Sequence, residues 1–548
     1  MRVLFRFFLR SFFISEVVAQ GAEPQVLAIT AAAFFAAPGI AICFCMTTMG
    51  SAINTDPVEA FFLALSMILS ALLALVLWDD LLPTPLDYLI LRPQPIPWRT
   101  VVLAKLLAWG VLMSLFMAVV NLFSCSMLPI VNTADQVTGI YLLRRMGAQA
   151  LGVAAGSAWM FLWIAAIRGA VALVGDARQW ARAARLALTA AFLAAIVVSP
   201  ELTEPSIYHH LALHPPWWCA PLFWFLGIAH GLNGRAAAAW TPLAWEGARQ
   251  LAVAVPVAAA SYGLACWRLP RRALAAASGR VRAPWPSAMA SRQPRRAAVY
   301  RFTLAMLARS RRHSLLLAAW LGLALAAVLA SLASLSWSVP SPSLAQTDVV
   351  ALAAPLALCA LIAVGLRHAY AIPAEVRANW LFRVSETEPA PERLLAARDV
   401  MLVLAVLPPL VLGGLLAWRI WGWEAALLHL LFAGSLMLLC VEVLLARFPK
   451  IPFTCPYVPG RANLKLWGFG YWLAFSTFAF GSAAMERRWW ASPARIVVAS
   501  AMVLAATAAL RLYGNRWRGA LPGCKFEDAP EPVVQQLFFG AGTDLSRS

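Results

Sequence analysis

"VEAFFLALSMILSALLALVLW", residues 58–78, is the stretch whose composition decides the fold class. Nearly all of its residues are apolar, and about 20 such residues cross a bilayer as an α-helix. Similar runs recur along the chain of 548 residues, of which 62% are hydrophobic and 13% charged, with a mean hydropathy of +0.73. A soluble domain carries about 25% charged residues, so most of this chain must face lipid. The sequence therefore predicts an all-α, polytopic integral membrane protein.

Apolar runs of spanning length predict about twelve transmembrane helices. The expected spans are residues 25–49, 58–78, 101–124, 147–168, 182–199, 245–267, 314–336, 349–370, 399–418, 424–446, 466–484 and 493–512. A stretch at 268–312 separates the first six from the last six, and it holds twelve arginines, several prolines and no acidic residue. The expected organisation is a six-helix half (1–267), a basic cytoplasmic linker (268–312), a second six-helix half (313–512) and a cytoplasmic tail (513–548).

The two halves share an order of features that predicts a degenerate repeat. Each begins with a basic amphipathic stretch, residues 2–13 and 296–314, and the first of these is typical of a helix lying in the membrane interface. In each half the third span opens on a similar phrase, TVVLAK at 100–105 and RLLAAR at 393–398. The halves are therefore expected to be built alike.

The formal net charge of +19 predicts the orientation. Cytoplasmic loops of membrane proteins carry an excess of Lys and Arg. Placing both termini, residues 79–100 and residues 268–312 on the cytoplasmic side puts most basic residues inside. Arg144–Arg145 and Arg487–Arg488 disagree, since they fall at outer ends. Attraction of the basic linker to anionic lipid headgroups accounts for its arginines without nucleic acid.

The centres of the expected spans lack the charged groups that ion-coupled transporters need. The candidates are His429 and Glu442, and Glu442 lies close to a cytoplasmic end. The chain has no GxxxxGK[ST] motif to cradle nucleotide phosphates, so ATP would bind a separate subunit. Neither its cysteines nor His210 and His214 complete a metal-ligand pattern. We expect no catalytic, cofactor or metal site, and we expect Gly152 and Gly156 to pack helices closely inside the bundle.

The segment "DDLLPTPLDYLILRPQPIPWRTVVLAK", residues 79–105, resembles the cytoplasmic loop of ABC-2 type exporter permeases. There an acidic start is followed by an Asp, a leucine-rich turn, a "PLPI"-like phrase and a lysine-bearing helix. Residues 365–386, 450–460 and 214–234 look similar to phrases of poorly characterised bacterial relatives of these permeases. The resemblance covers most of the chain and implies a multi-pass protein of the bacterial cytoplasmic (inner) membrane. A simple ABC-2 permease has six spans, so the expected twelve leave the number of copies open.

The resemblance implies an exporter subunit driven by a separate nucleotide-binding ATPase on the cytoplasmic side. Prolines at 83, 85, 93, 95 and 97 would force the chain out of the membrane helix into a docking element. A second docking element would lie at residues 371–398. The candidate ATPase-docking residues are Asp79, Asp80, Asp87, Tyr88, Arg92, Arg377, Trp380 and Arg383. The apolar spans favour a hydrophobic substrate, although exporters of sugars, peptides and drugs can share that character.

Two alternatives stay open at this point. One is a polytopic membrane glycosyltransferase that uses lipid-linked sugar, for which Asp79 and Asp80 could supply paired carboxylates. Those carboxylates would have to lie outside, which would also place the arginines of 268–312 outside. The other is a non-transporting membrane scaffold.

Overall fold

Helices form nearly all of the chain that the computed structural model describes, and no strand occurs in that part. The described residues are 1–14, 56–83, 85–91, 93–131, 139–173, 177–198, 221–233, 240–276, 294–337, 344–373, 392–446, 448, 452–453 and 464–519. Within these ranges, nine helices are long and apolar enough to cross a membrane. The expectation of an all-α, multi-pass membrane protein is confirmed at this level.

The expected count of twelve spans is not reached by the nine apolar helices of the described residues. The helices α7 (Ala177–Val198) and α18 (Leu464–Trp489) occupy two further expected spans, but they are more polar. In α7 the polarity comes from arginines in its first turns, including Arg182 and Arg185. The expected span 25–49 lies outside the described residues.

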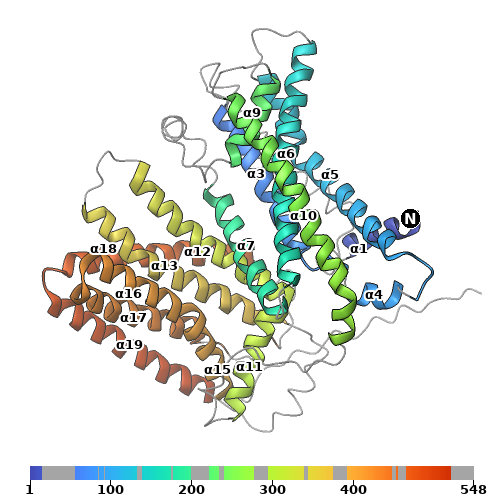
Figure 1. Cartoon of the computed structure of the whole chain (residues 1–548). Helices are drawn as coiled ribbons and strands as arrows, with labels where there is room; N and C mark the ends of the chain where they lie inside the picture. Colours follow the sequence, from blue (N-terminus) through green and yellow to red (C-terminus); the bar gives the residue numbers. More distant parts are fainter. Residues whose placement is uncertain are drawn as a thin grey trace, which may run out of the picture.

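The first half forms an upright bundle (Figure 1). Its helices are α3 (Asp56–Val76), α5 (Trp98–Val131), α6 (Gly139–Leu173), α9 (Pro221–Leu232) and α10 (Trp240–Ala276). The short helices α1 (Arg2–Ile14) and α4 (Pro85–Leu91) lie beside α5 and α10 respectively. In the middle, α6 packs against α3, α9 and α10, which makes it the central helix of this bundle.

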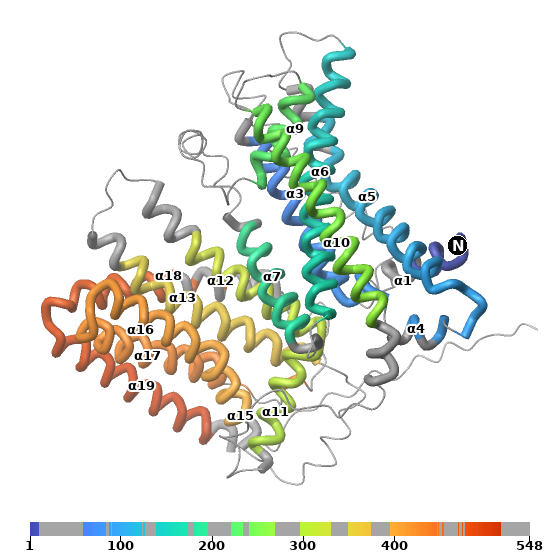
Figure 2. The backbone as a smooth tube through the Cα atoms, in the orientation of Figure 1, coloured from blue at the N-terminus to red at the C-terminus, as the bar shows by residue number. Residues whose placement is uncertain are grey.

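The second half forms an inclined bundle (Figure 2). Its helices are α12 (Arg311–Trp337), α13 (Leu344–Ala371), α15 (Glu392–Met401), η5 (Leu402–Val406), α16 (Leu407–Trp421), α17 (Trp423–Leu445), α18 and α19 (Pro493–Gly519). The helix α11 (Pro294–Arg309) precedes α12 and packs against α15. Between α16 and α17 the chain turns at Gly422, whose φ of 86° favours glycine.

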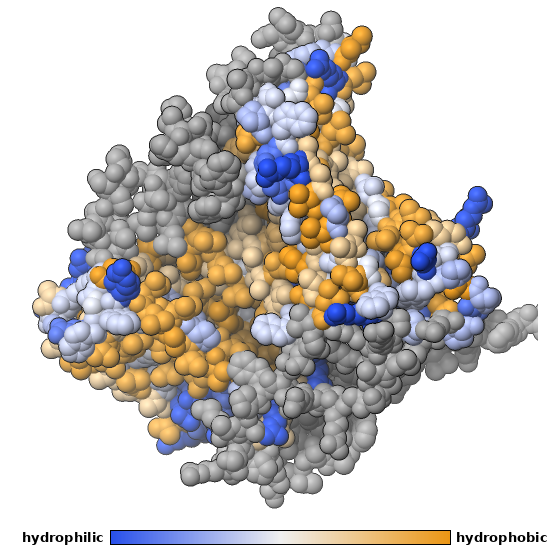
Figure 3. Space-filling view, viewed as in Figure 1, coloured by the Kyte–Doolittle hydropathy of each residue, from blue (hydrophilic) through white to orange (hydrophobic). Residues whose placement is uncertain are grey.

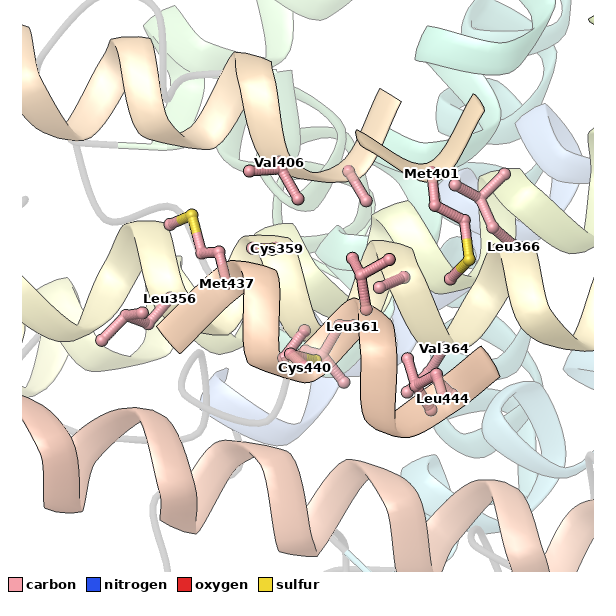
Figure 4. Close-up of a cluster of buried hydrophobic side chains, with 14 of the residues drawn as sticks. Leu356, Cys359, Leu361, Val364, Leu366, Met401, Val406, Met437, Cys440 and Leu444 are labelled. Carbon is pink, nitrogen blue, oxygen red and sulfur yellow. The ribbon is translucent and has the colours of Figure 1, made fainter. Parts of the chain in front are cut away.

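Close-packed apolar side chains from α13 and α17 form the largest core of the second bundle. Figure 4 shows Leu361 and Val364 of α13 facing Cys440 and Leu444 of α17. Met401 of α15 lies beside Leu366 of α13 in the same cluster. Inside lipid the hydrophobic effect does not bring helices together, so close packing of this kind must supply much of the stability.

Small residues let helices of the first bundle pack closely. A Cβ on Gly152 would lie 2.9 Å from the Cβ of Ala229 in α9, and one on Gly156 would lie 3.1 Å from the Met67 side chain in α3. Both glycines therefore serve tight packing inside the bundle, as the spacing predicted.

The two bundles meet along α7 and α12, which run in the same direction. Near the start of both helices Arg185 contacts Ser314, and further along Gly322 packs against Ala190 and Leu193. A Cβ on Gly322 would lie 2.7 Å from the carbonyl oxygen of Ala190, so the helices touch through their backbones. We call this α7–α12 contact the seam between the halves.

The helices α3, α6 and α10 end, and α5, α7 and α12 begin, at one end of the molecule. We call it the junction end, and the opposite end is the far end. Exposed apolar side chains cover the faces of α16 and α19 between these ends, as Figure 3 shows in orange for the inclined bundle. Such faces suit contact with lipid.

Candidate functional site: a charged junction between the halves

After α3 the chain makes a short turn at the junction end. Side chains from other helices of the first half contact this turn. Trp78 is buried, and the Nε of Arg168 in α6 donates to its carbonyl at 3.1 Å. The guanidinium of Arg168 also lies over the Trp78 ring, 5.6 Å from the ring centre. The Tyr262 hydroxyl of α10 donates to the Leu81 carbonyl at 3.1 Å. Two helices of the first half, α6 and α10, therefore hold this turn in place.

Two arginines tie the same turn to the seam. The Arg185 guanidinium of α7 lies 2.6 Å from the Asp79 carboxylate and 3.2 Å from the Ser314 hydroxyl of α12. In α12, Arg311 lies 3.7 Å from the Asp80 carboxylate and donates to the Val76 carbonyl. The Asp80–Arg311 ion pair therefore connects the first half directly to the second, and the Asp79–Arg185 pair reaches the second half through the hydrogen bond from Arg185 to Ser314. We call Asp79, Asp80, Arg185 and Arg311 the clasp.

A third ion pair joins α4 to α5. The Lys105 ammonium lies 3.3 Å from the Asp87 carboxylate and donates to the Leu82 carbonyl at 3.1 Å. It also lies over the Phe8 ring of α1, at 5.2 Å from the ring centre. The carboxylate of Asp87 thus pairs with a buried cation, and this pair joins α4 to the longer helix that follows it.

The clasp aspartates differ in their environment. Asp79 is 58% exposed at its side chain, whereas its partner Arg185 is 5% exposed. Burial raises the pKa of the Asp80 carboxyl above its ordinary 3.8, and the charges of Arg311 and Lys105 oppose this without cancelling it. The cost of removing Asp80 from water therefore exceeds the attraction that its neighbours supply.

The predicted docking residues fall into three groups. Asp79, Asp80 and Asp87 bind arginine or lysine within the chain rather than lining an open rim. Tyr88, expected to fill a groove on a partner, is buried at 4% exposure, and its ring packs edge-on against Trp98 at 5.3 Å. That expectation of an exposed Tyr88 is wrong for this structure, because the turn after α4 folds Trp98 back onto it. The remaining candidates, Arg92, Arg377, Trp380 and Arg383, lie outside the described residues.

The outward face of this segment is formed by other residues. Ile90 of α4 is 59% exposed, and Pro93, Gln94, Pro95, Pro97 and Arg99 are also exposed. We call Ile90, Pro93, Gln94, Pro95, Pro97 and Arg99 the α4 surface. It is a mixed apolar and polar set of exposed side chains, and in the chain it lies between the two partners of the Asp87–Lys105 pair.

The second half has its own ion pairs at the junction end. Arg296 of α11 binds both carboxylate oxygens of Asp399 at 2.6 and 2.7 Å. Arg398 of α15 lies 2.7 Å from Glu442 of α17, so the acidic residue that stood out in the sequence is paired. Lys105 and Arg398, which the predicted repeat aligned, therefore both form partly buried ion pairs at the junction end.

The arginines that disagreed with the charge rule make internal contacts at the far end. Arg144 donates to the Leu232 carbonyl at the end of α9, at 2.7 Å, and Arg145 is buried. Arg487 lies over the Trp490 ring, 5.1 Å from its centre. Arg144 and Arg487 therefore cap and pack helix ends, whereas Arg488 is exposed.

Comparisons with known proteins leave the chain without an assigned family: no family model, no curated protein and no solved structure matches it. In the described part of the chain, no three His, Cys, Asp or Glu side chains gather closely enough to hold a metal ion. His210 and His214 lie outside that part.

Proposed function

We propose that the chain is the membrane-spanning permease subunit of an ABC-2 type exporter, driven by a separate cytoplasmic ATPase. The observation that supports the proposal is a series of ion pairs that runs from α4, through the turn after α3, to the seam. A force on α4 would reach α5 through Asp87 and Lys105. Through the turn held by Trp78, the same force would reach Arg185 of α7 and Arg311 of α12. A partner pressing at one place would thus act on both halves.

The distribution of basic residues supports a cytoplasmic junction end. Lys105, Arg168, Arg185, Arg311 and Arg398 all lie there. Basic residues gather on the cytoplasmic side of membrane proteins. The pairing of Asp79 with Arg185 and of Asp80 with Arg311 also disfavours the glycosyltransferase alternative, since both carboxylates are engaged in contacts that hold the chain together.

The α4 surface replaces Tyr88 as the expected contact for the ATPase. An exposed isoleucine beside prolines and an arginine gives an apolar centre with a polar edge, the usual pattern of a protein interface. Because the carboxylates are engaged inside the chain, they position this surface instead of touching the partner.

The test is co-purification of ATP hydrolysis with the full-length chain from its native membrane in mild detergent. The wild type should carry ATP hydrolysis, and Ile90→Asp should lower it about tenfold, since truncating a central contact costs about 1.4 kcal/mol or more. Ile140→Asp is the matched control, because Ile140 is 84% exposed at the far end. Equal hydrolysis with both variants, or none with the wild type, would remove the proposal.

A further inference from the structure

Two arginines of α1 differ from most charged groups of the two bundles in having no acidic partner within the described residues. No ion pair there involves Arg2 or Arg6, and the sequence has no acidic residue before Glu16. Buried acidic side chains at the far end, by contrast, pair with histidines of other helices: Glu59 with His230, and Glu486 with His429. The charge of α1 must therefore be balanced by something else.

The side chains of α1 form stripes along the helix, because residues four apart share a face. Leu4 and Phe8 are buried, at 8% and 2% exposure, in the apolar cluster that α1 shares with α5. Arg2 and Arg6 come two positions earlier, which is about 200° around the helix. Both arginines are exposed, so they point away from α5.

A third stripe of α1 is apolar and yet exposed. Val3 and Phe7 are 80% and 54% exposed, and they lie between the arginine stripe and the buried stripe. Apolar and basic side chains exposed next to each other are typical of a helix at the boundary between acyl chains and headgroups. Because Arg binds phosphate through paired hydrogen bonds, this pattern fits a phospholipid better than an acidic protein surface.

The buried stripe of α1 contacts the ion pair that joins α4 to α5. The Lys105 ammonium lies 5.2 Å from the centre of the Phe8 ring and 3.3 Å from the Asp87 carboxylate. Figure 1 shows α1 beside α5, at the outer edge of the upright bundle. This contact places α1 at the junction end. If that end is cytoplasmic, as proposed, α1 meets the leaflet whose anionic lipids attract basic segments.

The second half contains a comparable helix that is held differently. The helix α11 packs on α15, as α1 packs on α5. Arg296 of α11 binds both carboxylate oxygens of Asp399 in α15, so an internal ion pair ties these two helices together. The described contacts of α1 with α5 are apolar packing and the approach of Lys105 to Phe8. An external anion would therefore add more to the packing of α1 than to that of α11.

We propose that α1 binds anionic phospholipid headgroups through Arg2 and Arg6, with Val3 and Phe7 in the adjoining acyl region. Binding stabilises α1 against α5 and thereby holds Phe8 on Lys105. The Asp87–Lys105 pair, and with it the position of α4, then depends on the lipid around the chain. The lipid site does not rest on the proposed function, whereas its consequence for ATPase docking does.

The experiment is hydrogen–deuterium exchange, read by mass spectrometry, of the full-length chain in two kinds of nanodisc. One is pure phosphatidylcholine, and the other contains one quarter phosphatidylglycerol. Amides of α1 should exchange about thirtyfold more slowly with phosphatidylglycerol, because each of two basic residues is attracted to the anionic surface. Amides of α4 should also exchange more slowly.

Two results of this comparison would contradict the proposal. Equal exchange of α1 in both lipids would overturn it and leave a partner protein as the occupant of the arginine stripe. Slower exchange of α1 without any change in α4 would overturn the connection to α4. The comparison needs no ATPase, so its failure would leave the proposed docking at the α4 surface standing.

Two double variants with the same change of charge test the assignment to α1. Arg2→Gln with Arg6→Gln should abolish the response to phosphatidylglycerol. Arg301→Gln with Arg309→Gln is the matched control, because both residues are exposed on α11, and the response of α1 should persist. A response that survives the first pair, or that both pairs abolish, would overturn the assignment.

Free inorganic phosphate, added to nanodiscs of pure phosphatidylcholine, separates a lipid from a soluble anion. It should not slow the exchange of α1, because it is not held at the membrane surface beside Val3 and Phe7. Slowing by free phosphate to the same extent as by phosphatidylglycerol would overturn the choice of a lipid as the ligand.

Discussion

Replacing the two neighbouring clasp aspartates by asparagine should have different effects on stability. In Asp79→Asn, Arg185 loses a carboxylate at 2.6 Å and keeps only the Ser314 hydroxyl, while its own side chain stays 5% exposed. A hydrogen bond between charged groups contributes about 1.5–3 kcal/mol. Asp79 is 58% exposed, so solvent screening reduces the expected loss to about 1 kcal/mol.

Asp80→Asn should cost less at neutral pH, because ionised Asp80 is itself unfavourable in the fold. Its folded-state pKa is raised above 3.8, mainly by burial, so the folded protein holds this proton more tightly than the unfolded chain does. The stability that the fold gains from binding this proton is fully present below pH 3.8, and it is lost as pH rises through the folded-state pKa of Asp80. Asp80→Asn should flatten that part of the stability profile.

The measurement is the free energy of unfolding from denaturant titration in detergent micelles, at neutral and at acidic pH. Asp79→Asn should lower it at neutral pH, and Asp80→Asn should leave it equal or higher. A larger loss for Asp80→Asn than for Asp79→Asn, or a wild-type contribution from Asp80 that grows with rising pH, would refute this account of the clasp.

Three further substitutions test the packing by the same unfolding measurement. Tyr88→Ala should cost about 3 kcal/mol, because it empties a buried site against Trp98; an effect under 1 kcal/mol would contradict its burial. Gly152→Leu should destabilise by about 1–3 kcal/mol, whereas Gly110→Leu, with open space around the added Cβ, should not; equal losses would contradict the close contact with α9. Arg398→Met should cost about 3 kcal/mol by leaving Glu442 unpaired, and adding Glu442→Met should recover most of it; no recovery would mean that the pair acts otherwise.

Periodic apolar runs were enough to predict most helices and the place of the turn after α3. The partners of Asp79 and Asp80 were not predictable, because Arg185 and Arg311 lie far along the chain and meet the turn only through the seam. Nothing in a seven-residue helix indicates which face is covered, so Tyr88 was expected to be exposed although Trp98 packs on it.

Charged residues near helix ends were the second weakness of the sequence argument. Glu59 and Glu486 lie in the first turn of α3 and the last turn of α18, where an acidic residue ordinarily faces water. Their histidine partners come from other helices, so burial and pairing appear only when α9 and α17 are in place.

The side of the membrane on which the α4 surface lies tests the central claim most directly. Gln94→Cys and Ile140→Cys place single new thiols on exposed positions at the junction end and the far end. Intact cells are treated with a membrane-impermeant thiol reagent, and labelling is compared with the parent chain and with permeabilised cells. The account predicts labelling of Ile140→Cys in intact cells, and of Gln94→Cys only after permeabilisation. Labelling of Gln94→Cys in intact cells would contradict a cytoplasmic ATPase contact and return Asp79 and Asp80 to the outer face.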